Sequence, residues 1–197
     1  SAELAAHLGP MSDERIELYP EVNAVCLPAG TRFDPGGIGK GLAGDIVADT
    51  LREAGATSVQ VELGGDIRVA GPEWSGGSWD VVLDDSDHGT SHAATISIPE
   101  GGVATSSVMR RRWKRGGSQM HHLIDPSTGL PAATDLDSVT VAASSLWLAE
   151  VIAKVALVGG AKQARRLLER SGTSGVLVSS EGDRVNYEVV SNSEISA

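Results

Sequence analysis

Cysteine is nearly absent from this chain, because Cys26 is the only one among its 197 residues. An internal disulfide is therefore impossible, and the cysteine count indicates no cellular compartment. Aromatic residues are also scarce, with four tryptophans, two tyrosines and one phenylalanine. Aliphatic side chains and alanine must fill the core. The length suits one domain with a substantial core, which we expect to span residues 1–197.

Positive charge and long apolar runs are lacking as well. The formal net charge is −10, which argues against non-specific nucleic-acid binding, because such binding needs a positive field. An anionic ligand would need a local positive pocket. No signal peptide and no run of about 20 apolar residues is found, so we expect no membrane segment in this chain. Because it starts at Ser1 rather than Met, we interpret the chain as a processed piece whose missing leader could have carried targeting, and its localisation stays open.

Glycine is abundant, and it is concentrated in the segment Asp34–Asp45, which contains five glycines and Lys40. A helical pattern follows, and we expect that helix to stop near Gly55. Glycine allows a backbone to approach a ligand closely, and a helix start presents unpaired N–H groups. With a lysine added, this segment predicts an anion site, most naturally for phosphate. The apolar residues of the helix fall on one side: Leu42, Ile46, Val47 and Leu51.

Two named phosphate motifs can be tested in this segment. A Walker-type loop fails, because Asp34 stands where glycine is needed and Gly41 where serine or threonine is needed. The dinucleotide pattern G-x-G-x-x-G matches at Gly39, Gly41 and Gly44. That pattern needs a strand before it and a repeated βαβ layout around it. A nicotinamide-dinucleotide oxidoreductase is therefore an alternative that depends on a parallel sheet.

Strands and helices mix along the chain without regular βαβ alternation, which predicts an α+β fold with a mixed or antiparallel sheet and packed helices. Expected strands lie at 21–27, 58–63, 67–69, 79–83, 94–98, 103–107, 138–143, 176–179 and 184–190. A short helix is possible at 2–8. One helix is expected from a cap at Ser144 or Ser145 to Val158, stopped by Gly159-Gly160, and a second at 161–170.

Several polar groups could carry chemistry. His121 and His122 lie near Asp125, which could orient a histidine for proton transfer or could simply cap the following turn. The basic run Arg110–Arg115 could bind phosphate, but such runs are more often solvated loops. Glu150 and Lys154 share a helix face and, taken alone, predict an exposed ion pair.

Five segments, in this order, resemble the ApbE family, the FAD:protein FMN transferases. The resemblance runs from about Leu18 to Val190 and implies an ApbE-like, T-fold-related core. The resembling segments are Asp34–Asp45, Leu63–Arg68, Val103–Ser106, His121–Gly129, and Ser138–Ala142 with the Ala149-Glu150 helix.

The resemblance implies an enzyme that moves FMN from FAD to a threonine of a flavoprotein target and releases AMP, with Mg²⁺ holding the pyrophosphate. By match, the catalytic residues are His122, Asp125 and Glu150, and the metal-binding residues are Gly37 and Glu150. The residues that bind FAD by match are Gly36, Gly37, Lys40, Asp45, Gly64, Gly65, Asp66, Thr105 and Ser106.

Two departures from the family pattern matter. The family has Asp and, four residues later, Thr as metal ligands on the late helix, whereas this chain has Glu150 and Lys154. A protonated lysine cannot ligate Mg²⁺, although its ammonium could occupy the metal's place. The family is also normally longer at its N-terminus, where the additional part helps to cover the ligand. The alternative is therefore a non-catalytic, flavin-nucleotide-binding relative with Lys154 in place of the metal.

Overall fold

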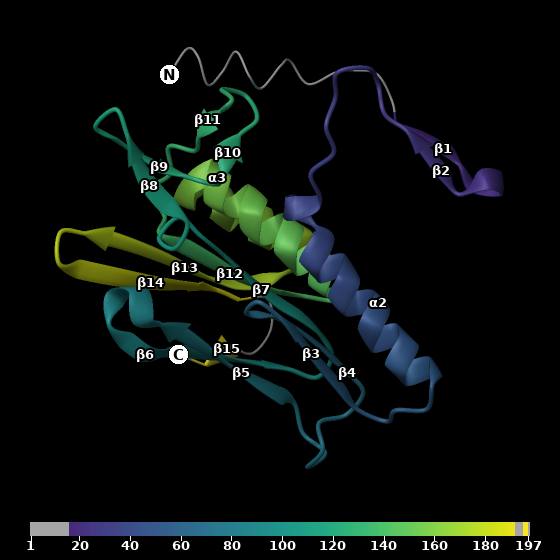
Figure 1. Ribbon diagram of the computed structural model, residues 1–197. Helices are drawn as coiled ribbons and strands as arrows, with labels where there is room; N and C mark the ends of the chain where they lie inside the picture. The colour runs from purple at the N-terminus through teal and green to yellow at the C-terminus, as the bar shows by residue number, and fades with distance from the viewer. Residues whose placement is uncertain (1–15, 192–194, 197) are drawn as a thin grey trace.

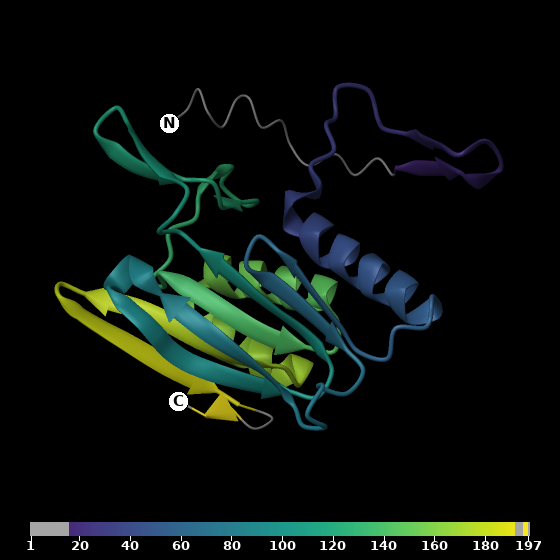
Figure 2. The same cartoon turned by 60° about the horizontal axis from the view of Figure 1, so that its bottom comes forward.

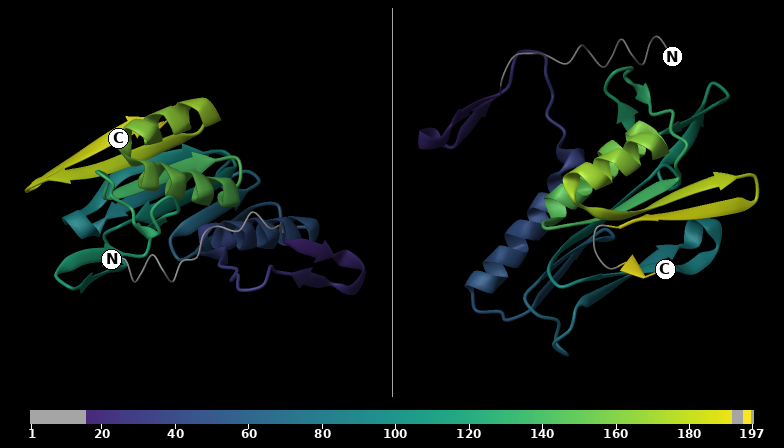
Figure 3. Two further views of the ribbon diagram at one scale, coloured as in Figure 1. Left: turned by 90° about the horizontal axis from the view of Figure 1, so that it is seen from above. Right: turned by 180° about the vertical axis from the view of Figure 1, so that it is seen from behind.

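The computed structural model describes residues 16–191 and 195–196, and its main feature is a layered α+β core. Two helices cover one face of a six-stranded sheet, and a small sheet covers the other face (Figures 1 and 3). The expected helix at 2–8 lies outside the described residues. Among the described helices, none is long and apolar enough to cross a membrane.

The central sheet has the strand order β14-β13-β12-β7-β4-β3, and each neighbouring pair is antiparallel. The alternative of a nicotinamide oxidoreductase, which required a parallel βαβ sheet, therefore loses its structural basis in the described chain. The strands are β3 Val59–Leu63, β4 Asp66–Ala70, β7 Gly101–Ser107, β12 Ser138–Ala143, β13 Ser174–Glu181 and β14 Arg184–Val190.

The central sheet has an apolar core on each of its faces. On β12, Val139 and Val141 are fully buried in the core that the sheet forms with helix α3, Leu146–Ser171. The next residue, Ala142, belongs to the second core, on the opposite face. The short run of β-branched residues that predicted this strand is thus buried on both sides.

The second core is closed by a three-stranded sheet of β5 Trp79–Asp85, β6 Thr90–Ile98 and β15 Ile195–Ser196. The predicted hairpin of β5 with β6 is confirmed as an antiparallel pair. The 3-10 helix η3, Ser86–His88, lies in the loop between them. Figure 2 shows this hairpin in front of the central sheet.

Helix α2, Gly39–Glu53, packs against α3 through its small residues rather than through its apolar ones. A Cβ added to Gly41 would lie 2.4 Å from Cα of Trp147, so the two helices approach almost backbone to backbone. The apolar side that the sequence indicated faces solvent. Its residues are between 43 and 57% exposed: Leu42, Ile46, Val47 and Leu51.

Helix α3 begins after Ser145, which is one of the two residues expected to cap it. The Ser145 side chain, however, forms no capping hydrogen bond. The Asp45 carboxylate of α2 caps α3 instead, accepting the N–H groups of Leu146 at 3.0 Å and Trp147 at 2.9 Å. The predicted stop at Gly159-Gly160 is confirmed: Gly160 has a non-helical φ of 75°, and a second helical segment follows it, as expected for 161–170, within the span of α3.

The remaining elements are short hairpins at the periphery (Figure 1). The strand expected at 21–27 is wrong in its first half, where Pro20 opens the 3-10 helix η1, Pro20–Val22, and Asn23 adopts a left-handed conformation. The pairs are β1 Glu17–Tyr19 with β2 Ala24–Cys26, β8 Arg112–Arg115 with β9 Ser118–His121, and β10 Ile124–Asp125 with β11 Leu130–Pro131. The 3-10 helix η2, Pro35–Gly37, precedes α2.

Candidate functional site

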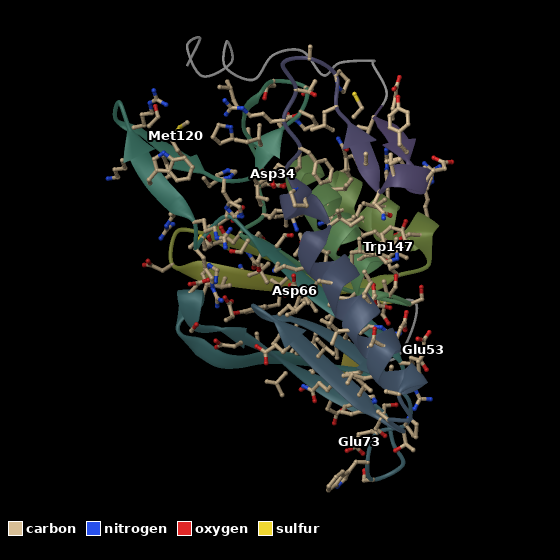
Figure 4. The ribbon with its side chains drawn as sticks, turned by 45° about the vertical axis from the view of Figure 1, so that its right-hand side comes forward. Asp34, Glu53, Asp66, Glu73, Met120 and Trp147 are labelled. Carbon is tan, nitrogen blue, oxygen red and sulfur yellow. The ribbon has the colours of Figure 1, made fainter. Side chains whose placement is uncertain are left out.

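A cavity of about 610 Å³ opens between the central sheet, the β5–β6 hairpin and the base of the β8–β9 hairpin. Its wall includes the β3–β4 turn and the end of β7, and Asp66 lies near the middle of the view in Figure 4. The volume is in the range of ordinary ligand sites. The cations on its wall are Lys40, Arg110, Arg111 and Lys154.

The β3–β4 turn positions one buried carboxylate in the wall. Gly64 and Gly65 have φ of 60° and 88°, which a two-residue hairpin turn needs and glycine adopts without strain. The next residue, Asp66, is only 2% exposed and accepts the Thr105 N–H at 3.2 Å. Its second oxygen forms an ion pair with Lys40 of α2. Asp66 therefore holds Lys40 at the cavity, where the lysine side chain is half-exposed.

Hydroxyl groups line the floor of the cavity. Thr105 on β7 stands directly opposite Thr140 on β12, and their hydroxyl oxygens lie 2.9 Å apart. Ser106 also lines the wall but is only 7% exposed. The Thr105 hydroxyl, on an exposed residue, can offer a hydrogen bond to a bound phosphate oxygen.

Glu150 and Lys154 form a buried pair, not the exposed one that their spacing alone predicted. Glu150 is 2% exposed and accepts the Lys154 ammonium at 2.8 Å and the Gly41 N–H at 2.7 Å, one bond to each oxygen. Both carboxylate oxygens are thus engaged by the protein. Lys154 reaches the cavity wall, and its side chain is 23% exposed.

His122 is the histidine that faces the cavity, while His121 points away and bonds the Ala132 carbonyl at 3.1 Å. Burial lowers the pKa of His122, and the positive charges of Arg111 and Lys154 lower it further. His122 is therefore neutral at neutral pH and can accept a proton.

Asp125 caps the turn that follows it, which is one of the two roles that its position in the sequence left open. Its carboxylate accepts the N–H of Ser127 at 2.8 Å and the hydroxyl of the same residue at 2.7 Å. These hydrogen bonds lower the pKa of Asp125. No bond between Asp125 and either histidine occurs in the described part of the chain.

Four residues that the resemblance assigned to the site do not line the cavity. In the described structure, its wall includes Gly36 but not Gly37, Asp45, Asp125 or Glu150. Asp45 is buried, capping α3 and forming an ion pair with Arg68 at 2.9 Å. Its carboxylate therefore acts at the junction of the two helices.

A second polar cluster on the wall was not anticipated from the sequence. His88 lies between Asp85, at 2.8 Å, and Asp137, at 3.3 Å, and the Tyr187 hydroxyl donates to Asp85 at 2.7 Å. Hydrogen bonding to Asp85 raises the pKa of His88, with Asp137 adding to the effect and burial opposing it. Asp137 and Tyr187 are distant in the sequence from the local pair Asp85 and His88, so no local spacing indicates the whole cluster.

Comparisons with known proteins agree with the resemblance. The model of the ApbE family matches residues 1–177. A Treponema pallidum protein named FAD:protein FMN transferase is 34% identical over 71% of this chain and 41% of its own length. An Escherichia coli protein of the same name is 29% identical over 74% of this chain and 42% of its own length. The chain thus spans less than half of these relatives.

Solved structures give the same result for the fold. The ApbE protein of Thermotoga maritima superposes with a TM-score of 0.78 at 28% identity, covering 94% of this chain and 60% of that one. The flavinyl transferase ApbE of Pseudomonas stutzeri superposes with a TM-score of 0.75 at 26% identity, covering 96% and 58%. By its sequence and by its fold, this chain belongs to the ApbE family.

Proposed function

We propose that this chain binds FAD in the cavity and transfers its FMN part to a threonine of a flavoprotein, releasing AMP. The relatives named FAD:protein FMN transferase are longer than this chain, so the activity is an inference for it. We also propose that residues 1–197 act as a single domain. In support, the central sheet joins strands from Val59 to Val190.

The observation that carries this proposal is the meeting of cations with glycine and hydroxyl groups at one cavity. Lys40, Arg111 and Lys154 line its wall. They share the wall with five carboxylates: Glu62, Asp66, Asp84, Asp85 and Asp87. A diphosphate is the part of FAD that such a group of cations would bind, because charge-assisted hydrogen bonds to phosphate are strong. Gly36, the Gly64-Gly65 turn and the Thr105 hydroxyl would complete its surroundings.

The transfer step needs one proton acceptor. The threonine oxygen of the acceptor would bond to the phosphorus of the FMN half, and the bond from that phosphorus to the oxygen bridging to AMP would break. AMP leaves with the electron pair on its phosphate oxygen, and the threonine proton passes to neutral His122. The protein's remaining contribution is positioning and charge neutralisation, as is usual for phosphoryl chemistry.

Magnesium, which the family implies, does not fit at Glu150 in this chain. Both Glu150 oxygens are already bonded, one to Lys154 and one to Gly41. Mg²⁺ needs several oxygen ligands in near-octahedral geometry, and a neighbouring ammonium would repel it. We therefore propose that the Lys154 ammonium, rather than a metal ion, provides positive charge near the diphosphate.

The activity is tested by incubating the chain with FAD, in Mg²⁺ and separately in EDTA, and separating the products by chromatography. The proposal expects AMP and FMN to form in both solutions, with water replacing threonine as the acceptor. Release of AMP only in Mg²⁺ would show that Glu150 holds a metal after all and would contradict the role of Lys154. Intact, unbound FAD in both solutions would overturn the function itself.

A second candidate is a non-catalytic flavin-nucleotide-binding relative, and the buried Glu150–Lys154 pair favours it. In that case, intact FAD would co-elute with the protein. The double variant Glu150→Asp/Lys154→Thr should then create Mg²⁺-dependent turnover, while Lys162→Thr, an exposed change on the same helix, should not. A double variant that binds FAD without turnover would show that the missing activity has another cause.

Lys40 provides an independent test of the phosphate site. Lys40→Ala should weaken FAD binding about tenfold, because one charge-assisted hydrogen bond to phosphate is lost. Isothermal titration calorimetry measures this, with Lys162→Ala as the control. Unchanged affinity for Lys40→Ala would remove the phosphate assignment of this part of the cavity.

A further inference from the structure

The β8–β9 hairpin has an unusual charge for this chain. Arg110–Arg115 contains five basic residues, and no acidic residue occurs between Val108 and Ile124. The structure shows that Arg112–Arg115 is an exposed strand and not the solvated loop that composition favoured. Arg110 pairs with Asp87 at 3.0 Å. Within the described residues, the other four cations have no carboxylate partner: Arg111, Arg112, Lys114 and Arg115.

The hairpin begins and ends at the cavity. Met109–Arg111, which lead into β8, and His122-Leu123, which leave β9, all line the cavity wall. Beyond them the hairpin projects from the body of the molecule, as Figures 1 and 2 both show. In Figure 4, Met120 marks it well away from Asp66. A polypeptide held on the hairpin would therefore be close to the rim of the cavity.

One face of the hairpin combines charge with an apolar centre. Trp113 pairs across the strands with Met120 and is 48% exposed. Because side chains alternate along a strand, Arg115 shares the face of Trp113. An exposed tryptophan beside arginines is typical of surfaces that bind other proteins.

We propose that this basic hairpin, Arg111–Arg115 with Met120, docks an acidic segment of the protein that accepts the flavin. The proposal rests on the proposed function, since that reaction needs a second protein at the cavity. Charge complementarity selects the partner: four unpaired cations stand on a chain whose formal net charge is −10. A nucleic acid carries denser negative charge over a greater length than a short acidic segment, so the net negative charge of the rest of the molecule would repel it more strongly.

The experiment measures binding of a short fluorescein-labelled peptide of alternating glutamate and glycine around one threonine, by fluorescence anisotropy. Two triple variants are compared with the unaltered chain. Arg112→Gln/Lys114→Gln/Arg115→Gln removes charge from the hairpin. Lys162→Gln/Arg166→Gln/Arg170→Gln removes the same charge from exposed positions on α3. Binding of FAD to each protein is measured by calorimetry in parallel.

The hairpin variant should bind the acidic peptide about tenfold more weakly, since several exposed ion pairs are lost, and the α3 variant less than about twofold. FAD binding should stay unchanged in both. Equal losses in the two variants, or equal binding of a glutamine version of the peptide, would overturn the proposal. So would tighter binding of a single-stranded oligonucleotide of equal charge or of phosphatidylserine vesicles. If the unaltered chain did not bind FAD, that result would instead count against the proposed function.

Discussion

At the scale of the residue, burial gives Glu150 a role that its sequence context conceals. The i,i+4 spacing to Lys154 shows that the two side chains share a helix face, but not whether that face is covered. In the structure, Glu150 is only 2% exposed, and its carboxylate accepts a hydrogen bond from the Gly41 N–H of helix α2. That partner is 109 residues away in the chain, so only the tertiary structure reveals it.

His122 permits a prediction from its lowered pKa. Because burial and nearby positive charge disfavour the imidazolium, its titration by NMR should have a midpoint below the ordinary value of 6.5. The unfolded chain then takes up this proton before the folded chain does. The contribution of His122 to stability is therefore present above the unfolded pKa and is lost as pH falls from there through the folded pKa.

The cause of the shift can be tested in the same titration. Arg111→Gln should move the midpoint of His122 upward, because a repelling charge next to the ring is removed. Lys114→Gln, an exposed change farther along the hairpin, should leave it in place. A midpoint at or above 6.5 in the unaltered chain would contradict both the shift and the proposed role of His122 as proton acceptor.

At the scale of the element, the glycines of α2 serve the packing of α2 against α3. A Cβ on Gly41 would lie 2.4 Å from Trp147 Cα, and this contact involves backbone that cannot move aside. Gly41→Ala should therefore lower the free energy of unfolding by about 3 kcal/mol, as overpacking of this kind does. Chemical denaturation measures the loss.

Gly37→Ala is the matched control, since an added Cβ there meets nothing within 4 Å. Its free energy of unfolding should change by less than about 0.5 kcal/mol. A Gly41→Ala protein as stable as the control would show that α2 and α3 can separate without cost. The close helix approach would then not be needed for stability.

The sequence predicts elements well where local pattern and environment agree. Ser138–Ala143 matches β12, because a β-branched run suits a strand covered on both faces. The sequence does not predict the buried face of α2, because the contacts with α3 are made by Gly41 and Gly44, which have no apolar side chain to mark that face. The site is similar: Lys40 and Asp66 are recognisable from their segments, whereas the capping role of Asp45 depends on a helix 101 residues away.

At the scale of the whole molecule, the His88 cluster joins two layers. His88 and Asp85 belong to the β5–β6 hairpin, whereas Asp137 immediately precedes β12 and Tyr187 is on β14 of the central sheet. Three separate segments meet here, and only Asp85 and His88 are close to each other in the sequence. The sequence therefore could not predict either this cluster or the cavity wall that it forms.

The raised pKa of His88 predicts a pH-dependent contribution to stability. Protonated His88 stabilises the fold, so its contribution is full below the unfolded pKa and is lost as pH rises through the folded pKa. His88→Gln should lower Tm by about 2–4 °C at acidic pH, corresponding to about 1 kcal/mol, and by less at alkaline pH. Differential scanning calorimetry at both pH values measures the difference.

Tyr187→Phe is the comparison for this experiment. It removes a hydrogen bond to the same Asp85 carboxylate without removing a group that titrates in this range. Its effect on Tm should be similar at acidic and alkaline pH. If the effect of His88→Gln were also independent of pH, the link between the two layers would not depend on the charge of His88.

The break at Gly160 interrupts the regular rotation of side chains around α3, so its two halves are separate helical segments. Glu150 and Lys154 lie before the break, whereas after it Asp135 accepts the Ala161 N–H at 2.8 Å and Leu168 packs close to Gly175 of β13. In an unbroken helix, one inserted residue would rotate everything on one side relative to the other by about 100°. Here each half of α3 has its own contacts with the body of the protein, and that of Glu150 is with the Gly41 N–H. The angular position of the Glu150–Lys154 pair is therefore set by the packing of the first half, without a continuous helix through Gly160.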